Sequence, residues 1–439
     1  GSLADGRTWV VLSKVDNEAL TRVGPGTAMG NLMRQYWLPA LLSRELPTAD
    51  SDPVRVMLLG EQLIAFRDSS GQVGLVANNC PHRGASLFFG RNEESGLRCV
   101  YHGWKFALDG TCVDMPNEPA ESDFRTKVKA VAYPCRERGG IVWAYLGTSS
   151  VPPPLPDIEA NLLPDGVAQA DAVQRECNWL QALEGDIDTS HLGFLHMGAL
   201  EPQMMEPGTF GYYTVADRRP RYAIVDTDGG TMYGAYRPAA PPMNYWRIAQ
   251  FLFPCFALIP GGVLGREILT RAWVPMDDTH TMYFNMGAPG ATRGMDFSET
   301  LPNTSDWYGR FRLAYDASND YGVDRAKQRS RASYTGLSTI HLEDQAITES
   351  MGPILDRTNE HLGAADSMVI RTRRRLLAAV QALADHGTEP PGVSDPSVYQ
   401  TRSGSVFLPQ DADWIEATKH LRQAFVDHPE LDPNPKLAV

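Results

Sequence analysis

Short apolar runs separated by turn residues fill positions 46–150 of the chain. The runs are rich in β-branched and aromatic residues, which favour strands, and the Asp, Ser, Asn and Gly residues between them favour turns. Strands are predicted at 54–59, 62–67, 73–78, 98–100, 104–107 and 141–146. Short strands at this spacing predict a small antiparallel barrel or sandwich.

Longer helical patterns join the strands in the second part of the chain. Val151-Pro152-Pro153-Pro154 stiffens the backbone and marks a boundary. Beyond it, strands are predicted at 222–227, 231–236, 245–259, 267–275 and 281–286, and helices at 306–315, 342–350, 367–386 and 413–427. We therefore expect an α+β protein with a leader at 1–45 that packs on the last part, a β domain at 46–150 and a larger α+β domain at 151–439.

One helical pattern carries residue types that bind metals. In NWLQALEGDIDTSHLGFLH, residues 178–196, apolar side chains recur about every 3.6 residues and predict a helix. Asp188 and His191 would share one face of it, and His196 follows Gly193, where the helix can loosen and turn the second imidazole toward the first. Two imidazoles and a carboxylate from elsewhere form the facial triad of a non-haem iron site, which leaves half of the octahedron open. Two histidines with ordinary hydrogen bonds are the alternative.

Composition narrows the class of protein. The chain has 439 residues, of which 43% are hydrophobic and 21% charged, as in ordinary globular proteins. Its formal net charge of −13 argues against nucleic acid and against anionic membranes as partners, and no apolar run is long enough to cross a bilayer. Six cysteines in a chain of this length are too few for a disulfide scaffold, so we expect a cytoplasmic protein.

A second cluster of metal-binding residue types lies about a hundred residues upstream. The chain reads CPHRGAS from Cys80 and CVYHGWKF from Cys99, so that His82 and His102 follow the cysteines in two short loops. Two thiolates can hold one iron of a 2Fe–2S cluster while two imidazoles hold the other. A structural zinc site could use the same four residues, although zinc more usually shows C-x2-C and H-x3-H spacing.

The two loops resemble the Rieske motif, and residues 178–196 resemble the mononuclear-iron motif of the Rieske non-haem iron oxygenases. Residues 29–39, 178–196 and 341–366 are most similar to the phthalate dioxygenase group of that family, which includes aromatic-carboxylate hydroxylases and aryl-ether O-demethylases. The resemblance implies a small antiparallel β Rieske domain and a larger catalytic domain whose antiparallel sheet is flanked by helices in a helix-grip, START-like arrangement. It also implies two cofactors, a Rieske 2Fe–2S cluster and a mononuclear Fe(II).

The resemblance places the third iron ligand late in the catalytic domain. There the chain reads HLEDQ, and Asp344, 148 residues after His196, is the expected ligand. Glu343 is the alternative ligand. Both acids would also suit the start of a helix without any metal.

Asp188 would then not be a ligand. Beside His191 it fits a supporting role in which its carboxylate accepts the imidazole N–H. Similar proteins use this aspartate to bridge to a cluster histidine of the neighbouring subunit, which here would be His102. Glu184, one turn earlier, either helps to hold that bridge or is a solvated helix residue.

The electrons must come from outside the chain. It has no GxGxxG fingerprint and no plant-type four-cysteine pattern, so NAD(P)H and flavin belong to a partner protein. The resemblance implies a reductase with flavin and its own iron–sulfur centre. It also implies a head-to-tail homotrimer, or two stacked trimers, in which the cluster of one chain serves the iron of the next.

Basic residues in the strands after the iron segment point to an anionic substrate. Arg247 alternates with Trp246, so one of the two points inward, and an arginine there could clamp a carboxylate through two hydrogen bonds. Arg221 is a second candidate for an anion contact, and Thr189, next to Asp188, could donate a hydrogen bond. Arginines that face solvent or pair with acids are the alternative.

These features together predict a terminal oxygenase component that uses O2 and reductase-supplied electrons to dihydroxylate an aromatic carboxylate of the phthalate or benzoate type. O-demethylation of a methoxylated aromatic acid is the alternative, because the same iron could hydroxylate a methyl group. A protein that only transfers electrons and a zinc-binding scaffold are more distant alternatives.

Overall fold

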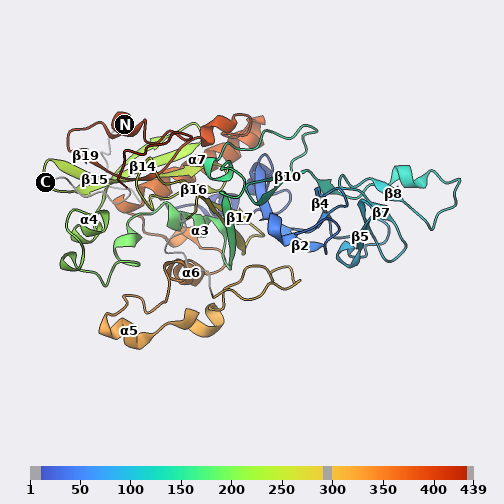
Figure 1. The fold of residues 1–439 in the computed structure, drawn as a ribbon, viewed down its shortest axis with the longest axis horizontal. Coiled ribbons are helices and arrows are strands. Elements are labelled where there is room, and N and C mark those ends of the chain that lie inside the picture. Colours follow the sequence, from blue (N-terminus) through green and yellow to red (C-terminus); the bar gives the residue numbers. More distant parts are fainter. Residues whose placement is uncertain (1–10, 290–298, 433–439) are drawn as a thin grey trace.

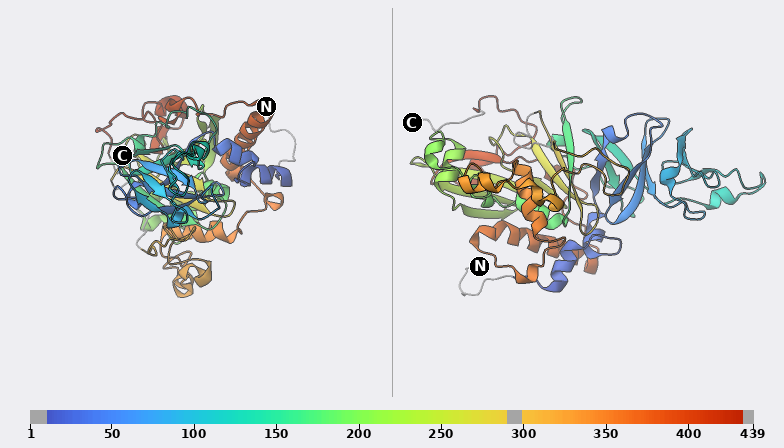
Figure 2. Two further views of the ribbon diagram at one scale, coloured as in Figure 1. Left: turned by 90° about the vertical axis from the view of Figure 1, so that its right-hand side faces the viewer. Right: turned by 90° about the horizontal axis from the view of Figure 1, so that it is seen from below.

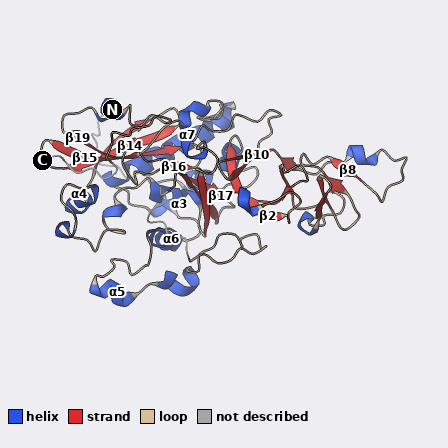
Figure 3. Ribbon diagram, viewed as in Figure 1, coloured by secondary structure: helices blue, strands red, loops and turns tan. Residues whose placement is uncertain are grey.

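The computed structural model describes residues 11–289 and 299–432 and shows an elongated chain (Figure 1). Two small sheets formed by residues 54–133 lie toward one end, and a large antiparallel sheet with its helices forms the other. This is the expected α+β fold, and Figure 3 shows helices on the flanks of the large sheet. No helix within the described ranges is long and apolar enough to cross a membrane.

The small β part contains two four-stranded antiparallel sheets. Their orders are β2-β3-β4-β9 and β5-β6-β7-β8, and the strands are β2 (Val54–Leu58), β3 (Glu61–Arg67), β4 (Val73–Ala77), β9 (Ala132–Tyr133), β5 (Arg91–Glu93), β6 (Gly96–Arg98), β7 (Lys105–Phe106) and β8 (Cys112–Asp114). A third sheet, β1-β11-β10, joins β1 (Trp37–Leu42), β11 (Ile141–Tyr145) and β10 (Cys135–Arg138). The predicted strand at 98–100 is wrong, because β6 ends at Arg98 and the chain turns at Cys99.

The large sheet runs in the order β12-β18-β17-β16-β15-β14-β13, with β19 paired to the free part of β15. Its strands are β12 (Gln169–Arg175), β13 (Arg221–Asp226), β14 (Gly230–Pro238), β15 (Met243–Leu252), β16 (Phe256–Leu258), β17 (Leu269–Pro275), β18 (Thr281–Gly287) and β19 (Gly404–Pro409). The predicted strand region at 245–259 is two strands, β15 and β16. Strands β12 and β19 were not predicted.

The helices are α1 (Lys14–Thr21), α2 (Ala28–Met33), α3 (Trp179–Asp186), α4 (Phe210–Ala216), α5 (Arg325–Ser330), α6 (Ile340–Ser350), α7 (Ser367–His386) and α8 (Trp414–Thr418). Helix α7 has the predicted bounds, and α6 begins two residues before its predicted start. The helix predicted at 413–427 is only the short α8. The helix predicted at 306–315 is wrong, because this segment pairs with residues 299–304 through backbone hydrogen bonds such as Leu301 N–H to Arg312 O.

The main core lies between the large sheet and the helices on its inner face. Helix α7 packs on β13 and β14, and α3 packs on β16 and β17. Helices α1 and α2 from the leader lie beside α7, as both views in Figure 2 show. Strand β1, the last part of the predicted leader, instead pairs with β11. The leader thus contacts both parts of the chain, and its first ten residues lie outside the described ranges.

Candidate metal centres and substrate cavity

The two Cys–His loops have the same backbone hydrogen bonds. Cys80 N–H donates to Ala85 O and Gly84 N–H donates back to Cys80 O, and the second loop repeats this with Cys99, Trp104 and Gly103 at distances of 2.8 to 3.0 Å. Both glycines have a φ near +80°, a conformation that side chains other than glycine rarely adopt. The glycines in the two motifs are therefore required by the turns that carry the cysteines.

The loops bring the four predicted cluster residues together. The rings of His82 and His102 lie 4.5 Å apart, and Trp104 stacks on His82 at 4.3 Å. The thiol of Cys80 is close enough to Cys99 to form a hydrogen bond, and burial raises the pKa of Cys80 to about 11. A bound metal ion would lower this pKa and hold Cys80 as a thiolate, and Cys99 beside it would supply the second sulfur ligand. His102 Nδ1 is buried without a hydrogen-bond partner in the described structure, as expected for a nitrogen reserved for a metal.

Helix α3 is fixed at both ends. Asn178 caps its first turn, and its amide N–H groups donate to the carbonyls of Thr21 and Asp278. At the other end, Asp186 accepts hydrogen bonds from Arg271 at 2.5 Å and from Trp273 at 2.7 Å, both on β17. These buried partners hold the end of the helix against the sheet.

The predicted continuation of this helix to residue 196 is wrong. Helix α3 ends at Asp186, and Asp188 Oδ1 then accepts the N–H of Ser190 at 2.7 Å, a local bond that competes with helix. A short 3-10 turn follows at His191–Gly193. The guanidinium of Arg218 donates to the carbonyls of Gly193 and of two later residues, Met197 and Leu200, and so holds the loop closed.

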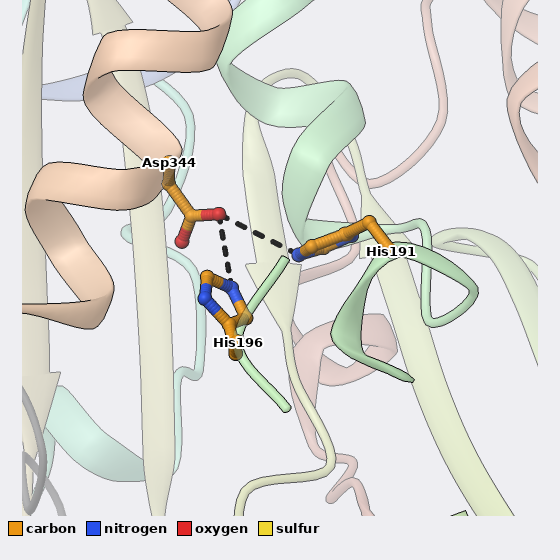
Figure 4. A group of neighbouring side chains, drawn as sticks. All are labelled: His191, His196 and Asp344. Atoms are coloured by element: carbon orange, nitrogen blue, oxygen red, sulfur yellow. Dashed lines mark ion pairs between the residues drawn. The ribbon is translucent and has the colours of Figure 1, made fainter. Parts of the chain in front are cut away.

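The loop and α6 bring His191, His196 and Asp344 to one point, as Figure 4 shows. Asp344 Oδ1 lies 3.1 Å from His196 Nε2 and 3.5 Å from His191 Nε2, and the three ligand atoms lie within 4.8 Å of one another. Two imidazole nitrogens and one carboxylate oxygen at this spacing form the donor set of a facial triad. The rest of the coordination sphere would face the cavity described below.

The electrostatic surroundings of His191, His196 and Asp344 favour a bound cation. Burial opposes a positive charge on His191, but hydrogen bonding to Asp188 and Asp344 outweighs it and raises the pKa of His191 to about 10. Burial also disfavours the charge of Asp344, yet the two histidines hold the pKa of Asp344 well below its ordinary value. A metal ion would replace the proton shared within this group. The residues therefore fit a divalent iron.

Glu343, the alternative ligand, has another partner. Its Oε2 lies 2.6 Å from His196 Nδ1, and its Oε1 accepts a hydrogen bond from Thr335 at 2.6 Å. With Nε2 of His196 turned toward Asp344, Nδ1 carries the proton and donates it to Glu343. This contact fixes the tautomer and orientation of a ligating histidine, which is the usual task of a carboxylate behind a metal site.

The two acids expected to assist the iron differ in position. Asp188 Oδ2 lies 3.4 Å from His191 Nδ1, and about a quarter of each side chain remains exposed. The side chain of Glu184 is 11% exposed and forms ion pairs with Arg357 and Arg373, and these are its hydrogen-bond partners among the described residues. Glu184 is therefore not a solvated helix residue, and its help in holding the Asp188 bridge stays a prediction. Glu184 joins α3 to α7 through Arg373.

A cavity of about 640 Å³ opens over the triad. Its wall includes His191, His196 and Asp344, the polar residues Asp188, Thr189, Tyr233, Arg247 and Glu267, and apolar side chains such as Leu192, Ile259 and Ile268. The volume is in the range of small-molecule sites. Arg247 points into this cavity from β15, whereas Trp246 packs on the opposite face of the sheet against Trp414.

Arg221 does not reach the cavity. It lies at the exposed start of β13, the edge strand of the large sheet, so its predicted contact with the substrate is wrong. Thr189 is buried at the cavity wall, where its Oγ1 accepts a hydrogen bond from Arg247 Nε at 2.7 Å. Sequence reasoning missed Glu267, and it grouped Arg218 with the basic residues near Arg221 without showing that Arg218 closes the iron-binding loop, because both roles depend on which backbone the fold brings beside each side chain.

Comparisons with known proteins identify the class. The family described as Rieske [2Fe-2S] domain matches residues 36–133, and the family described as LigXa C-terminal domain like matches residues 144–436. With the paired Cys–His loops and the His-His-Asp group, these matches define a Rieske-type oxygenase with a Rieske 2Fe–2S cluster and a mononuclear iron as cofactors.

Relatives support the same assignment over the whole chain. It is 48% identical over 422 residues to the 3-chlorobenzoate-3,4-dioxygenase oxygenase subunit of Comamonas testosteroni, covering 92% of this chain and 96% of that one. Identity is 35% over 434 residues to the phthalate 4,5-dioxygenase oxygenase subunit of Pseudomonas putida (92% and 94% covered). It is 31% over 398 residues to the 5,5'-dehydrodivanillate O-demethylase oxygenase subunit of Sphingobium sp. (88% and 85% covered).

A solved structure shows the same fold. Dicamba monooxygenase bound to dicamba aligns with a TM-score of 0.56 at 18% identity, over 81% of this chain and 99% of that one. The family matches and the relatives above show that the chain belongs to the Rieske non-haem iron oxygenases. It is an oxygenase component, an oxidoreductase that incorporates dioxygen.

Proposed function

We propose that the protein is a terminal oxygenase that dihydroxylates an aromatic carboxylate. The observation that carries this proposal is Arg247, which shares one cavity with the His-His-Asp group. A guanidinium in this position can bind the acid group through two hydrogen bonds and leave the ring over the metal. The named relatives that act on 3-chlorobenzoate and phthalate support the same substrate class.

The hydrogen-bond partners of Arg247 do not compensate its charge. Its Nε donates to Thr189 and its Nη1 to the hydroxyl of Tyr245, and both partners are neutral. Arg237, fully buried on the same face of the neighbouring strand β14, donates through Nε to the Asp217 carbonyl, and its two Nη atoms have no partner in the described structure. Because a charge shielded from water is costly unless compensated, the half-buried Arg247, with neutral hydrogen-bond partners in the cavity wall, favours an anionic ligand, and the positive charge of Arg237 on the same face of the sheet acts in the same direction.

Residues of the chain would orient the substrate and the metal ligands for the reaction. The bound cluster carries single electrons, and the bound iron activates dioxygen. Arg247 and Thr189 orient the acid group, and the apolar wall with Leu192 and Ile259 positions the ring and excludes water. Glu343 keeps the proton on Nδ1 of His196, and Asp188 does the same for His191.

We also propose that electrons cross between subunits. Strands β5 and β7, which flank the cluster loops, lie at the far end of the chain from α3 and α6, which carry the iron site (Figure 1). A head-to-tail homotrimer, single or stacked, would bring His102 of one subunit to Asp188 of the next. An NAD(P)H-dependent reductase with flavin and an iron–sulfur centre would reduce the cluster.

We expect the protein in the cytoplasm, because its six cysteines form no disulfide bond, as is usual in a reducing compartment.

O-demethylation is the second candidate. The relative that is an O-demethylase supports it, and the donor set at the metal would be the same. The outcome depends on which carbon the cavity holds nearest to the metal. Formaldehyde released in step with substrate consumption would identify this reaction.

Replacement of Arg247 tests the substrate class. Arg247→Gln should weaken binding of benzoates and phthalates about 10- to 150-fold, because a charge-assisted hydrogen bond contributes roughly 1.5–3 kcal/mol. Equilibrium titration of the anaerobic holoenzyme measures the dissociation constants. The matched control is Arg221→Gln, which removes an exposed arginine outside the cavity and should leave binding unchanged. Equal affinity of the Arg247→Gln variant and the unmodified protein would contradict the carboxylate clamp.

A further inference from the structure

The substrate cavity contains one carboxyl group that the metal site does not use. Glu267 lies between β16 and β17 and lines the same cavity as Arg247. Among the described residues it forms no ion pair, and its Oε2 is shielded from solvent without a hydrogen-bond partner. The adjacent Arg266 donates instead to the carbonyl of Leu431. The backbone N–H groups of Gly262 and Gly261 face this carboxyl group, but a carboxylate has about four acceptor positions, so a half-buried one in a cavity wall keeps hydrogen-bonding capacity for a ligand.

The backbone is shaped around this carboxyl group. A Cβ atom on Gly261 would lie 2.7 Å from Oε1 of Glu267, and one on Gly262 would lie 3.0 Å from its Oε2. Contacts this short would displace the carboxyl group, so two consecutive glycines make room for it. The N–H groups of the same two glycines act on the carboxyl group, so the loop backbone positions Glu267 in the cavity wall. A few fixed polar groups in an otherwise apolar cavity are what determine ligand orientation and specificity.

The charge state of Glu267 is compatible with an acidic substrate. Burial raises its pKa to about 7, and the N–H of Gly262 and the charges of Arg271 and Arg247 act in the opposite direction. Near neutral pH the group is thus partly protonated. It need not repel a carboxylate bound at Arg247, and its oxygens can still accept a hydrogen bond.

We propose that Glu267 binds a hydrogen-bond donor on the aromatic ring of the substrate. Arg247 then binds the acid group, and Glu267 in the same cavity accepts a hydrogen bond from a hydroxyl or amino substituent. The preferred substrates are aromatic acids that carry such a substituent. This inference rests on the proposed function, because it requires an aromatic acid at Arg247.

Binding to the anaerobic holoenzyme tests this inference. The panel contains benzoate, 3-chlorobenzoate, the 3- and 4-hydroxybenzoates, the matching aminobenzoates and the methoxybenzoates, which fill similar space without a donor. We expect at least one hydroxy- or aminobenzoate to bind about tenfold more tightly than benzoate and than its methoxy counterpart. Glu267→Leu should abolish this ratio, and Glu267→Gln, which keeps a carbonyl acceptor, should largely retain it.

Two results separate the inference from the proposed function. If benzoates bind and depend on Arg247, but no donor preference exists or the preference survives Glu267→Leu, the role of Glu267 is wrong and the proposed function stands. If no aromatic acid binds at all, the proposed function is wrong and the inference fails with it. The visible spectrum of the cluster and the melting temperature of each variant show that the compared proteins are folded and loaded.

Discussion

Asp344→Asn will lose the mononuclear iron and lower turnover by more than about 100-fold, beyond the roughly 10- to 100-fold effect of a residue that only supports a ligand. Asp344 supplies the one carboxylate oxygen among the three atoms that meet within 4.8 Å. An amide of the same shape leaves no anionic ligand, and two neutral imidazoles hold ferrous iron weakly. Iron analysis after dialysis measures the loss, and the electron paramagnetic resonance signal of the reduced cluster should be unchanged.

Glu343→Gln is the matched control for this prediction. It changes the neighbouring acid on the same helix, whose carboxylate lies 2.6 Å from His196 Nδ1. Because the amide oxygen can still accept the imidazole N–H, iron should remain bound and turnover should fall by no more than about 10- to 100-fold. If the Glu343 variant lost its iron and the Asp344 variant kept it, the two assignments would have to be exchanged.

Asp188→Asn will keep both metals and slow electron delivery to the iron by about 100-fold, at the upper end of the effect of removing a carboxylate that supports a metal ligand. Asp188 contacts His191 Nδ1 at 3.4 Å and remains partly exposed, so it can also meet a neighbouring subunit. The amide preserves the local bond to the N–H of Ser190 but removes the charge that the proposed bridge to His102 requires. The expected defect is therefore in transfer between subunits.

Single-turnover kinetics isolate that step. The reduced, substrate-bound variant is mixed with oxygen, and the colour of the cluster reports its oxidation. Metal content and substrate affinity should match those of the unmodified protein. An unchanged rate of cluster oxidation would contradict the bridge, whereas a slow rate with lost iron would assign Asp188 to iron binding.

Strands such as β2, and helix α7, were predictable because their patterns are local. Val54–Leu58 and Ser367–His386 follow from alternation and from a helical period. The end of α3 was not predictable, because Asp186 is held by Arg271 and Trp273 on β17, and because Asp188 accepts a hydrogen bond from the N–H of Ser190. The spacing of apolar residues cannot show where such hydrogen bonds end a helix.

The metal ligands were predictable in kind because cysteine, histidine and aspartate occur at characteristic spacings, and the resemblance supplied Asp344. The residues that surround the metal site and the cavity were not predictable. Glu343 reaches His196 across 147 residues of sequence, and the carboxyl group of Glu267 is defined by glycines on the same loop. Arg221 and Arg247 both lie in strands of one sheet, and only the fold shows that the first is at an exposed edge.

Labelled oxygen shows directly whether the protein inserts dioxygen into an aromatic carboxylate. The iron-loaded protein is incubated with 18O2, NADH, a reductase of the flavin and iron–sulfur type, and the aromatic acids named above, and the products are analysed by mass spectrometry. We predict a ring diol that carries two 18O atoms, formed without formaldehyde. Oxygen consumption that leaves every aromatic acid unlabelled and unchanged would contradict the account of this protein as an aromatic-carboxylate oxygenase.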